Sequence, residues 1–198
     1  MESINILVTG VGGQGTILAS DVLASVGLLA GYDVKKSEVH GMAQRGGSVT
    51  SHVRWGQKVY SPIIGCGEVD FLLAFEKLEA IRYVETVRPG CGVIIVNDQR
   101  IPPLSVNIGD EIYPDDDRLL HILHQVSSNV HVVPAIAVAE ELGNARVLNV
   151  VMLGTLSTLL DIPEDTWVTA IQQHVPRKLL EINTKAFQAG RGIPLIRT

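Results

Sequence analysis

The sequence is poor in cysteine, in aromatic residues and in charge. Its 198 residues include two cysteines, 5% are Phe, Trp or Tyr, and 19% are charged. Cys66 and Cys91 are far apart and belong to no C-x-x-C pair, so this chain alone lacks the four cysteines of an iron–sulfur cluster or a structural zinc site. We therefore expect two reduced thiols in a cytoplasmic protein.

Basic residues and long apolar runs are also scarce. Asp and Glu outnumber Lys and Arg by 21 to 16, which gives a formal net charge of −5, whereas nucleic acids and anionic membranes attract basic surfaces. The longest nearly uncharged run, residues 147–160, is too short to cross a bilayer, and the N-terminal residues lack the basic start of a signal peptide. We expect neither nucleic acid nor membrane as a partner. The low charged fraction favours a subunit, and it would also support a homodimer of the isolated chain.

The order of apolar runs predicts alternating strands and helices. We expect strands at residues 4–9, 33–39, 48–55, 70–75, 93–97 and 131–133, and helices near 16–29, 78–87, 115–126, 134–142, 145–160 and 176–189. A capping signal at 161–164 indicates one more helix, and we expect residues 100–105 to form a crossover or surface connection. Gly56-Gln57 fits a two-residue turn that would return residues 58–61 as an antiparallel partner of 48–55.

This alternation predicts one domain over residues 1–198. Its fold class is α/β, a three-layer α/β/α Rossmann-like domain with a mixed, mostly parallel sheet, one antiparallel hairpin and a helical C-terminal part from about 145 to 198.

A glycine-rich turn follows the first strand and opens the first helix. Gly10, Gly12 and Gly15 form G-x-G-x-x-G, where backbone N–H groups and the helix dipole favour an anion. A phosphate-bearing ligand is one interpretation, and a tight turn that only serves packing is the other. A P-loop is excluded, because Thr16 stands where that motif requires lysine. The predicted ligand-binding residues are Gly10, Gly12, Gly13, Gln14, Gly15 and Thr16.

A dinucleotide such as NAD would also need an acidic residue near the end of the second strand. Asp33 lies at the beginning of that predicted strand, and Glu38 lies nearer its end. The spacing therefore supports a dinucleotide only weakly.

A second glycine-rich loop follows the second predicted strand. In a doubly wound sheet it would share the carboxyl edge with the glycine turn, where ligands collect. Arginine binds carboxylate or phosphate, and histidine donates or accepts near neutral pH. A solvated surface crossover is the alternative. The predicted partner-facing or substrate-facing residues are His40, Gly41, Met42, Gln44, Arg45, Gly46, Gly47 and Ser48.

Other groupings of polar residues do not predict a site. Asp117, His121 and His124 share a helix face, which we expect to meet solvent rather than a metal. Ser51 and His52 point to opposite faces of a strand, so they do not form a triad with an acid. The sequence predicts no catalytic residue and no metal site in this chain.

Two segments resemble a known family. Residues 8–16 (VTGVGGQGT) and 37–49 (SEVHGMAQRGGSV) are similar to the beta subunits of indolepyruvate:ferredoxin oxidoreductases, and the resemblance extends through further segments to cover nearly the whole chain. More distantly, the chain resembles the gamma subunits or domains of the wider 2-oxoacid:ferredoxin oxidoreductases.

The resemblance implies a subunit that completes the active site for oxidative decarboxylation of an arylpyruvate. Coenzyme A would accept the aryl-acetyl group, and ferredoxin would take the electrons through the complex. Thiamine diphosphate and the iron–sulfur clusters would belong to a larger alpha subunit, and this chain would be inactive alone. The glycine turn would meet a phosphate of coenzyme A, and Arg45 in the second loop would supply a charge contact. The alternatives are a stand-alone NAD(P)-type oxidoreductase domain and a non-catalytic scaffold subunit.

Overall fold

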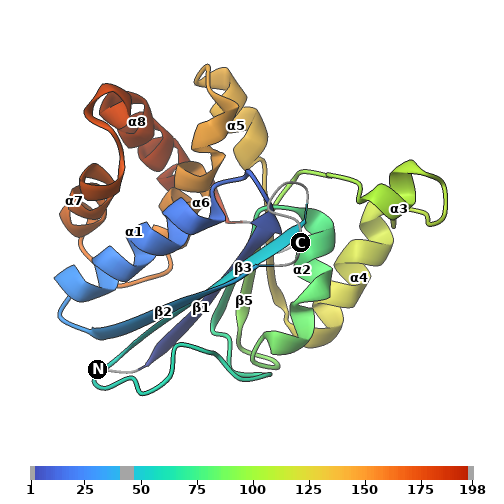
Figure 1. Ribbon diagram of the computed structural model, residues 1–198, viewed down its shortest axis with the longest axis horizontal. Coiled ribbons are helices and arrows are strands. Elements are labelled where there is room, and N and C mark those ends of the chain that lie inside the picture. Colours follow the sequence, from blue (N-terminus) through green and yellow to red (C-terminus); the bar gives the residue numbers. More distant parts are fainter. Residues whose placement is uncertain (1–2, 41–46, 196–198) are drawn as a thin grey trace.

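A six-stranded mixed sheet forms the centre of the computed structural model (Figure 1), which describes residues 3–40 and 47–195. The strands are β1 (Ile4–Val11), β2 (Asp33–His40), β3 (Ser48–Gly56), β4 (Phe71–Ala74), β5 (Val93–Asn97) and β6 (Asn129–Val133). Their order is β2-β3-β1-β4-β5-β6. β1, β4, β5 and β6 are parallel, and β3 is antiparallel to both β1 and β2. The predicted α/β class with a mixed, mostly parallel sheet is confirmed.

The predicted hairpin at Gly56-Gln57 is wrong. Residues 57–61 form no strand, and the antiparallel partners of β3 are β1 and β2. Side chains hold the loop after β3 instead: the Asp33 carboxylate accepts from the Val59 N–H at 2.8 Å, and Arg54 donates to the carbonyl oxygen of Ile63 at 3.0 Å. The turn signal marked the end of β3 correctly but did not specify which strands would pair.

Helices cover the sheet on two faces, which gives the predicted three layers (Figure 1). One face carries α1 (Thr16–Leu29), α5 (Ala135–Glu141), α6 (Leu148–Ser157), α7 (Glu164–His174) and α8 (Leu180–Arg191). The other carries α2 (Lys77–Arg82) and α4 (Asp116–Val126), and the short α3 (Leu104–Asn107) lies beside the end of α4, away from the sheet. Alternating residues of β1 serve the two cores, because Ile6 and Val8 pack toward α1 and Leu7 packs toward α2.

Several helices are shorter than the apolar pattern predicted. The helix expected over 78–87 is α2, which ends at Arg82, followed by a 3-10 turn, Val84–Thr86. The helix expected over 145–160 is a 3-10 turn, Ala145–Val147, and then α6. The last helix likewise begins with a 3-10 turn, Arg177–Leu179. α7 begins after Pro163 without a side-chain cap, so the signal at 161–164 marked the helix but not its cap.

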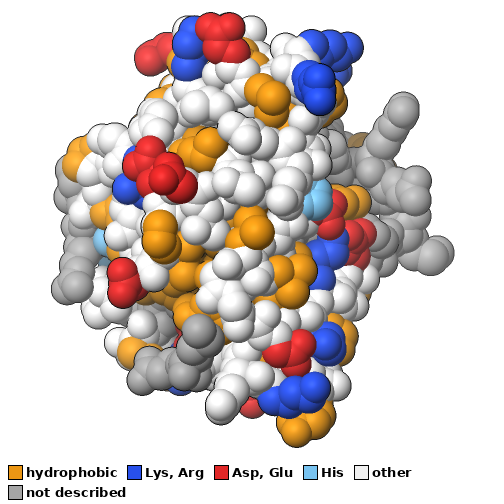
Figure 2. Space-filling model, turned by 90° about the vertical axis from the view of Figure 1, so that its left-hand side faces the viewer, with side chains coloured by type: hydrophobic (Ala, Val, Ile, Leu, Met, Phe, Trp, Pro, Cys, Tyr) orange, Lys and Arg blue, Asp and Glu red, His pale blue; other side chains and the backbone are white. Residues whose placement is uncertain are grey.

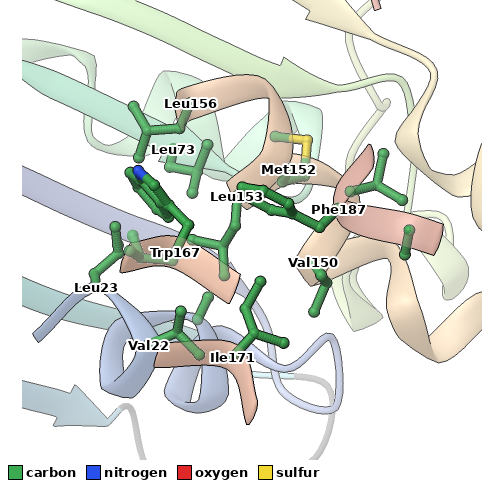
Figure 3. Close-up of a cluster of buried hydrophobic side chains, with 14 of the residues drawn as sticks. Val22, Leu23, Leu73, Val150, Met152, Leu153, Leu156, Trp167, Ile171 and Phe187 are labelled. Carbon is green, nitrogen blue, oxygen red and sulfur yellow. The ribbon is translucent and has the colours of Figure 1, made fainter. Parts of the chain in front are cut away.

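The larger core is built around α6, whose ten residues are all buried. Trp167 of α7 and Phe187 of α8 stack with their ring centroids 6.1 Å apart, and Met152, Leu153 and Leu156 of α6 lie beside them (Figure 3). α6 and α8 meet through Gly154 and Gly190, where an added Cβ on either glycine would collide with backbone of the facing helix. Only residues without a side chain permit this approach.

β2 lies at one end of the sheet order and carries several charges. Lys36 forms ion pairs with Asp21 of α1 and, at 2.6 Å, with Glu38. Burial lowers the pKa of Lys36, but its hydrogen bonds to the two carboxylates outweigh this effect and leave the pKa above its usual value.

Figure 2 views the molecule from the left-hand side of Figure 1, toward the C-terminal end of α1, where Leu28 and Leu29 are exposed. Hydrophobic side chains gather near the middle of this face, with charged side chains around them.

Candidate functional site

The glycine turn and the described end of the second loop touch at the carboxyl edge of the sheet. The Gly12 N–H donates to the Gly47 carbonyl oxygen at 2.9 Å, and Val11 lies opposite Ser48 in the β1–β3 register. β2 ends at the same edge, so the described residues on either side of the second loop lie where the sequence predicted. The side chain of His40 and five further residues with predicted contacts lie outside the described part of the structure: Gly41, Met42, Gln44, Arg45 and Gly46.

Two glycines of the turn adopt positive φ angles, for which glycine is favoured. Gly13 has φ 106°, and an added Cβ there would meet nothing within 4 Å. Gly15 has φ 83°, and an added Cβ there would collide with the side-chain amide of Asn149 in α6. Asn149 Nδ2 in turn donates to the Gly15 carbonyl oxygen at 3.3 Å. Gly15 therefore serves helix packing, whereas Gly13 leaves open space beside the backbone.

The turn uses some of its N–H groups internally and leaves others available. The Val11 N–H donates to Gln14 Oε1 at 2.7 Å, and the Gln14 N–H donates to the Val11 carbonyl oxygen at 3.1 Å. Within residues 3–40 and 47–195, the N–H groups of Gly13 and Gly15 have no hydrogen-bond partner. They lie directly before α1, which has no side-chain N-cap. Unpaired N–H groups at a helix N-terminus attract an anion.

A cleft of about 280 Å³ lies beside Val11 at the start of the turn, between the start of β3 and α2. One of its two buried carboxylates belongs to Glu79, which accepts from Ser48 Oγ at 2.5 Å and from Arg82 Nε at 3.1 Å. The Tyr83 hydroxyl lies 3.1 Å from the same Ser48 oxygen. Glu79 thus holds the first residue of β3, directly after the second loop.

Glu76 is a second buried carboxylate of this region, at the N-cap of α2. Its oxygens accept from the Glu79 N–H at 3.0 Å, from the Ile101 N–H at 3.0 Å and from the Tyr113 hydroxyl at 2.5 Å. Burial, together with this carboxylate, raises the pKa of Tyr113 above its ordinary value. The tyrosine therefore stays a hydrogen-bond donor, and Glu76 fixes the segment after β5 against α2.

A separate, mainly apolar pocket of about 190 Å³ lies between α4 and the strands β5 and β6. Lys77 closes it, with Nζ 2.5 Å from Asp98 and 2.8 Å from Asp116. Burial lowers the pKa of Lys77, but its hydrogen bonds to the two aspartates outweigh this effect and raise it overall. Because both aspartates already neutralise this lysine, the pocket offers less to an anion than the glycine turn does.

The acidic residues weighed for a dinucleotide lie elsewhere or are already paired. Asp33 lies opposite Gly56, at the amino end of β2, and its carboxylate accepts from the Val59 N–H and from Lys35. These hydrogen bonds lower the pKa of Asp33. Glu38 is paired with Lys36. Neither residue supports recognition of a ribose next to the turn.

The remaining polar groupings show no metal-binding arrangement in the described residues. No group of three or more His, Cys, Asp or Glu that could hold a metal ion occurs there, and both cysteines are exposed and unpaired. His52 Nδ1 accepts from the Ile64 N–H at 3.2 Å, away from the neighbouring Ser51. No helix in these ranges is long and apolar enough to cross a membrane.

Sequence reasoning did not single out several residues that shape this edge. Four of them form hydrogen bonds with the turn or its neighbours, namely Asn97, Gln99, Glu79 and Asn149. A polar residue that ends a buried strand, as Asn97 ends β5, was the one available signal. Glu79 and Asn149 reach the edge from helices, and no local pattern predicts that.

Comparison with known proteins gives consistent matches over nearly the whole chain. The family model "Pyruvate ferredoxin/flavodoxin oxidoreductase" matches residues 5–193. "Indolepyruvate oxidoreductase subunit IorB" of Thermococcus kodakarensis is 38% identical over 193 residues, which cover 96% of this chain and 95% of that protein. The subunit of the same name from Archaeoglobus fulgidus is 38% identical over 189 residues, covering 94% and 93%.

Solved structures share the fold. The gamma subunit of a keto/oxoacid ferredoxin oxidoreductase from Geobacter sulfurreducens superposes with a TM-score of 0.74 at 24% identity, covering 96% of this chain and 95% of that one. A 2-oxoglutarate:ferredoxin oxidoreductase from Magnetococcus marinus, with 2-oxoglutarate, coenzyme A and succinyl-CoA bound, gives 0.75 at 23% identity. There the match covers 96% of this chain and 31% of the other.

The family match, the full-length relatives and the fold agree, and the chain belongs to the pyruvate ferredoxin/flavodoxin oxidoreductase family.

Proposed function

We propose that this chain is the small subunit of an indolepyruvate:ferredoxin oxidoreductase and that its glycine turn binds a phosphate of coenzyme A. The observation that carries the first part is 38% identity to IorB subunits over 96% of the chain. The second part is supported by the N–H groups of Gly13 and Gly15 before α1, which have no hydrogen-bond partner among the described residues.

The reaction assigns different work to different subunits. One 2-oxoacid anion, one coenzyme A thiol and two oxidised ferredoxins give one acyl-CoA, one carbon dioxide, two reduced ferredoxins and one proton. Carbon–carbon bond cleavage and electron transfer are the chemistry of thiamine diphosphate and iron–sulfur clusters, which we assign to a larger partner subunit. With two exposed, unpaired cysteines, this chain's own contribution is binding and orientation.

The glycine turn would bind coenzyme A through a phosphate, away from its reactive thiol. Gly13 leaves open space beside the backbone, and the first turn of α1, which has no side-chain cap in the described part of the chain, adds further N–H groups. Holding one reactant lowers the entropy cost of the acyl transfer. The second loop begins at the same edge, and we propose that it faces the larger subunit.

The test is reduction of an electron acceptor by indolepyruvate and coenzyme A. The larger subunit is assayed with and without this chain at matched concentrations. Activity only in the mixture is expected. Full activity of the larger subunit alone would overturn the proposal and leave a scaffold role.

A second arm isolates coenzyme A. In the assembled complex, Gly13→Ala places a methyl group where the phosphate is expected and strains a backbone with φ 106°. We expect a higher KM for coenzyme A. Gly143→Ala is the matched control, because Gly143 also has a positive φ angle and open space but lies at the end of α5, outside the turn.

A further inference from the structure

The side chain of Gln14 is enclosed within the turn that sequence analysis assigned to a ligand. Gln14 is 8% exposed. Its Oε1 accepts from the Val11 N–H at 2.7 Å, and its Nε2 donates to the Phe75 carbonyl oxygen at 2.8 Å and to Gln99 Oε1 at 2.9 Å. Both N–H donors of the amide are used inside the protein, so the side chain has no donor left for a ligand.

Gly10 makes room for this amide. A Cβ added at Gly10 would lie 2.9 Å from Gln14 Oε1, 3.0 Å from the Thr16 methyl group and 3.1 Å from Phe75 Cβ. The φ angle of Gly10 is not positive, so conformational freedom is not what requires glycine there. The first glycine of the motif therefore serves the Gln14 side chain.

The amide of Gln14 belongs to a network along the carboxyl edge. Asn97 Nδ2 donates to the same two acceptors, the Phe75 carbonyl oxygen at 2.9 Å and Gln99 Oε1 at 3.1 Å. Asn97 Oδ1 accepts from the Ile136 N–H in the first turn of α5 at 3.1 Å. The network thus connects the turn with the ends of β4 and β5 and with α5, and each amide can take only one orientation.

We propose that Gln14 is a positioning residue: it holds the glycine turn in its binding shape and does not itself touch the ligand. By occupying the Val11 N–H, it limits anion contacts to Gly13, Gly15 and the first turn of α1. This inference rests on the proposed binding of coenzyme A and changes the role predicted for Gln14 from contact to support.

The test uses the assembled complex and two acyl acceptors, coenzyme A and pantetheine, which has the thiol but lacks the nucleotide phosphates. Gln14→Glu replaces the donor group with an oxygen facing two acceptor oxygens, so the turn should shift. Gly10→Ala keeps the amide but displaces it. We expect both variants to raise KM for coenzyme A about tenfold, with kcat and KM for pantetheine within about twofold of the unchanged protein.

Each other outcome decides a different point. A raised KM in only one of the two variants would overturn the positioning role, because a shift of the turn must appear in both. If neither variant changes KM for coenzyme A while Gly13→Ala does, the turn binds the ligand but Gln14 does not position it. If none of the three changes it, both the inference and the coenzyme A proposal fail. Thermal melting of each complex separates these results from loss of folding, and Gly143→Ala is the control.

Discussion

The backbone N–H of Gly12 donates to the carbonyl oxygen of Gly47 across the carboxyl edge, at 2.9 Å. This bond joins the glycine turn to the described end of the second glycine-rich loop, two segments that the sequence predicted at the same edge. It also places the base of the second loop against the turn rather than out in solvent. A ligand held by the turn would therefore lie close to Gly47 and Ser48.

Gly15→Ala should destabilise the protein by about 2 kcal/mol or more, because it combines a positive φ angle with a collision against Asn149. Chemical denaturation measures the change. Gly143 has a similar φ angle, but an added Cβ there would meet open space. The smaller loss of stability expected for Gly143→Ala therefore measures the cost of the backbone conformation alone. Equal losses in the two variants would contradict the packing role of Gly15.

Gly154→Ala should cost about 3 kcal/mol or more, because the added methyl group collides with the Phe187 carbonyl oxygen, which is backbone and cannot rotate away. A lower melting temperature would report the loss. Gly192→Ala, after the end of α8, provides the comparison, since its added Cβ meets nothing closer than 3.4 Å. A neutral Gly154→Ala variant would show that α6 and α8 are not held this close.

His52 should make stability depend on pH. Burial, and then the nearby Arg54, lower the pKa of His52, and its Nδ1 accepts a hydrogen bond from the Ile64 N–H. The stability that His52 contributes is therefore fully present above the pKa of about 6.5 that histidine has in the unfolded chain. It is lost as the pH falls toward the lower pKa of His52 in the folded protein. The free energy of unfolding should decrease as the pH falls below about 6.5. In His52→Asn, the free energy of unfolding should depend less steeply on pH.

Denaturant titrations between pH 5 and 7.5 test this prediction. His121→Asn is a suitable control, because it removes an exposed imidazole from α4. An identical slope in the unchanged protein and in His52→Asn would refute the role of His52.

Glu79→Gln should destabilise the protein by about 1–3 kcal/mol. The substitution removes the charge that pairs with Arg82 and weakens the acceptor of Ser48 Oγ, and the site is 4% exposed. Equilibrium unfolding of Glu79→Gln beside Glu85→Gln, at an exposed position, provides the measurement. The prediction fails if the two variants lose the same stability.

Local patterns predicted the elements well, because apolar runs such as β5 and the change of period after Gly15 directly reflect burial. They failed for the partner of β3, since pairing depends on which strand lies alongside and not on the turn that follows. In the site, the motif located the turn. The side chain of Gln14 leaves no room for a Cβ at Gly10, and the side chain of Asn149 leaves none at Gly15. Contacts with a residue as distant in sequence as Asn149 leave no local signature.

The charges on β2 bear on how this subunit would associate. A sheet edge invites the backbone of another chain to add a strand, and charged residues discourage that addition. Lys35, Lys36 and Glu38 lie along this terminal strand. Such an edge protects the unassembled chain against open-ended aggregation. It also means that assembly at the β2 edge would proceed through side-chain surfaces rather than by addition of a strand.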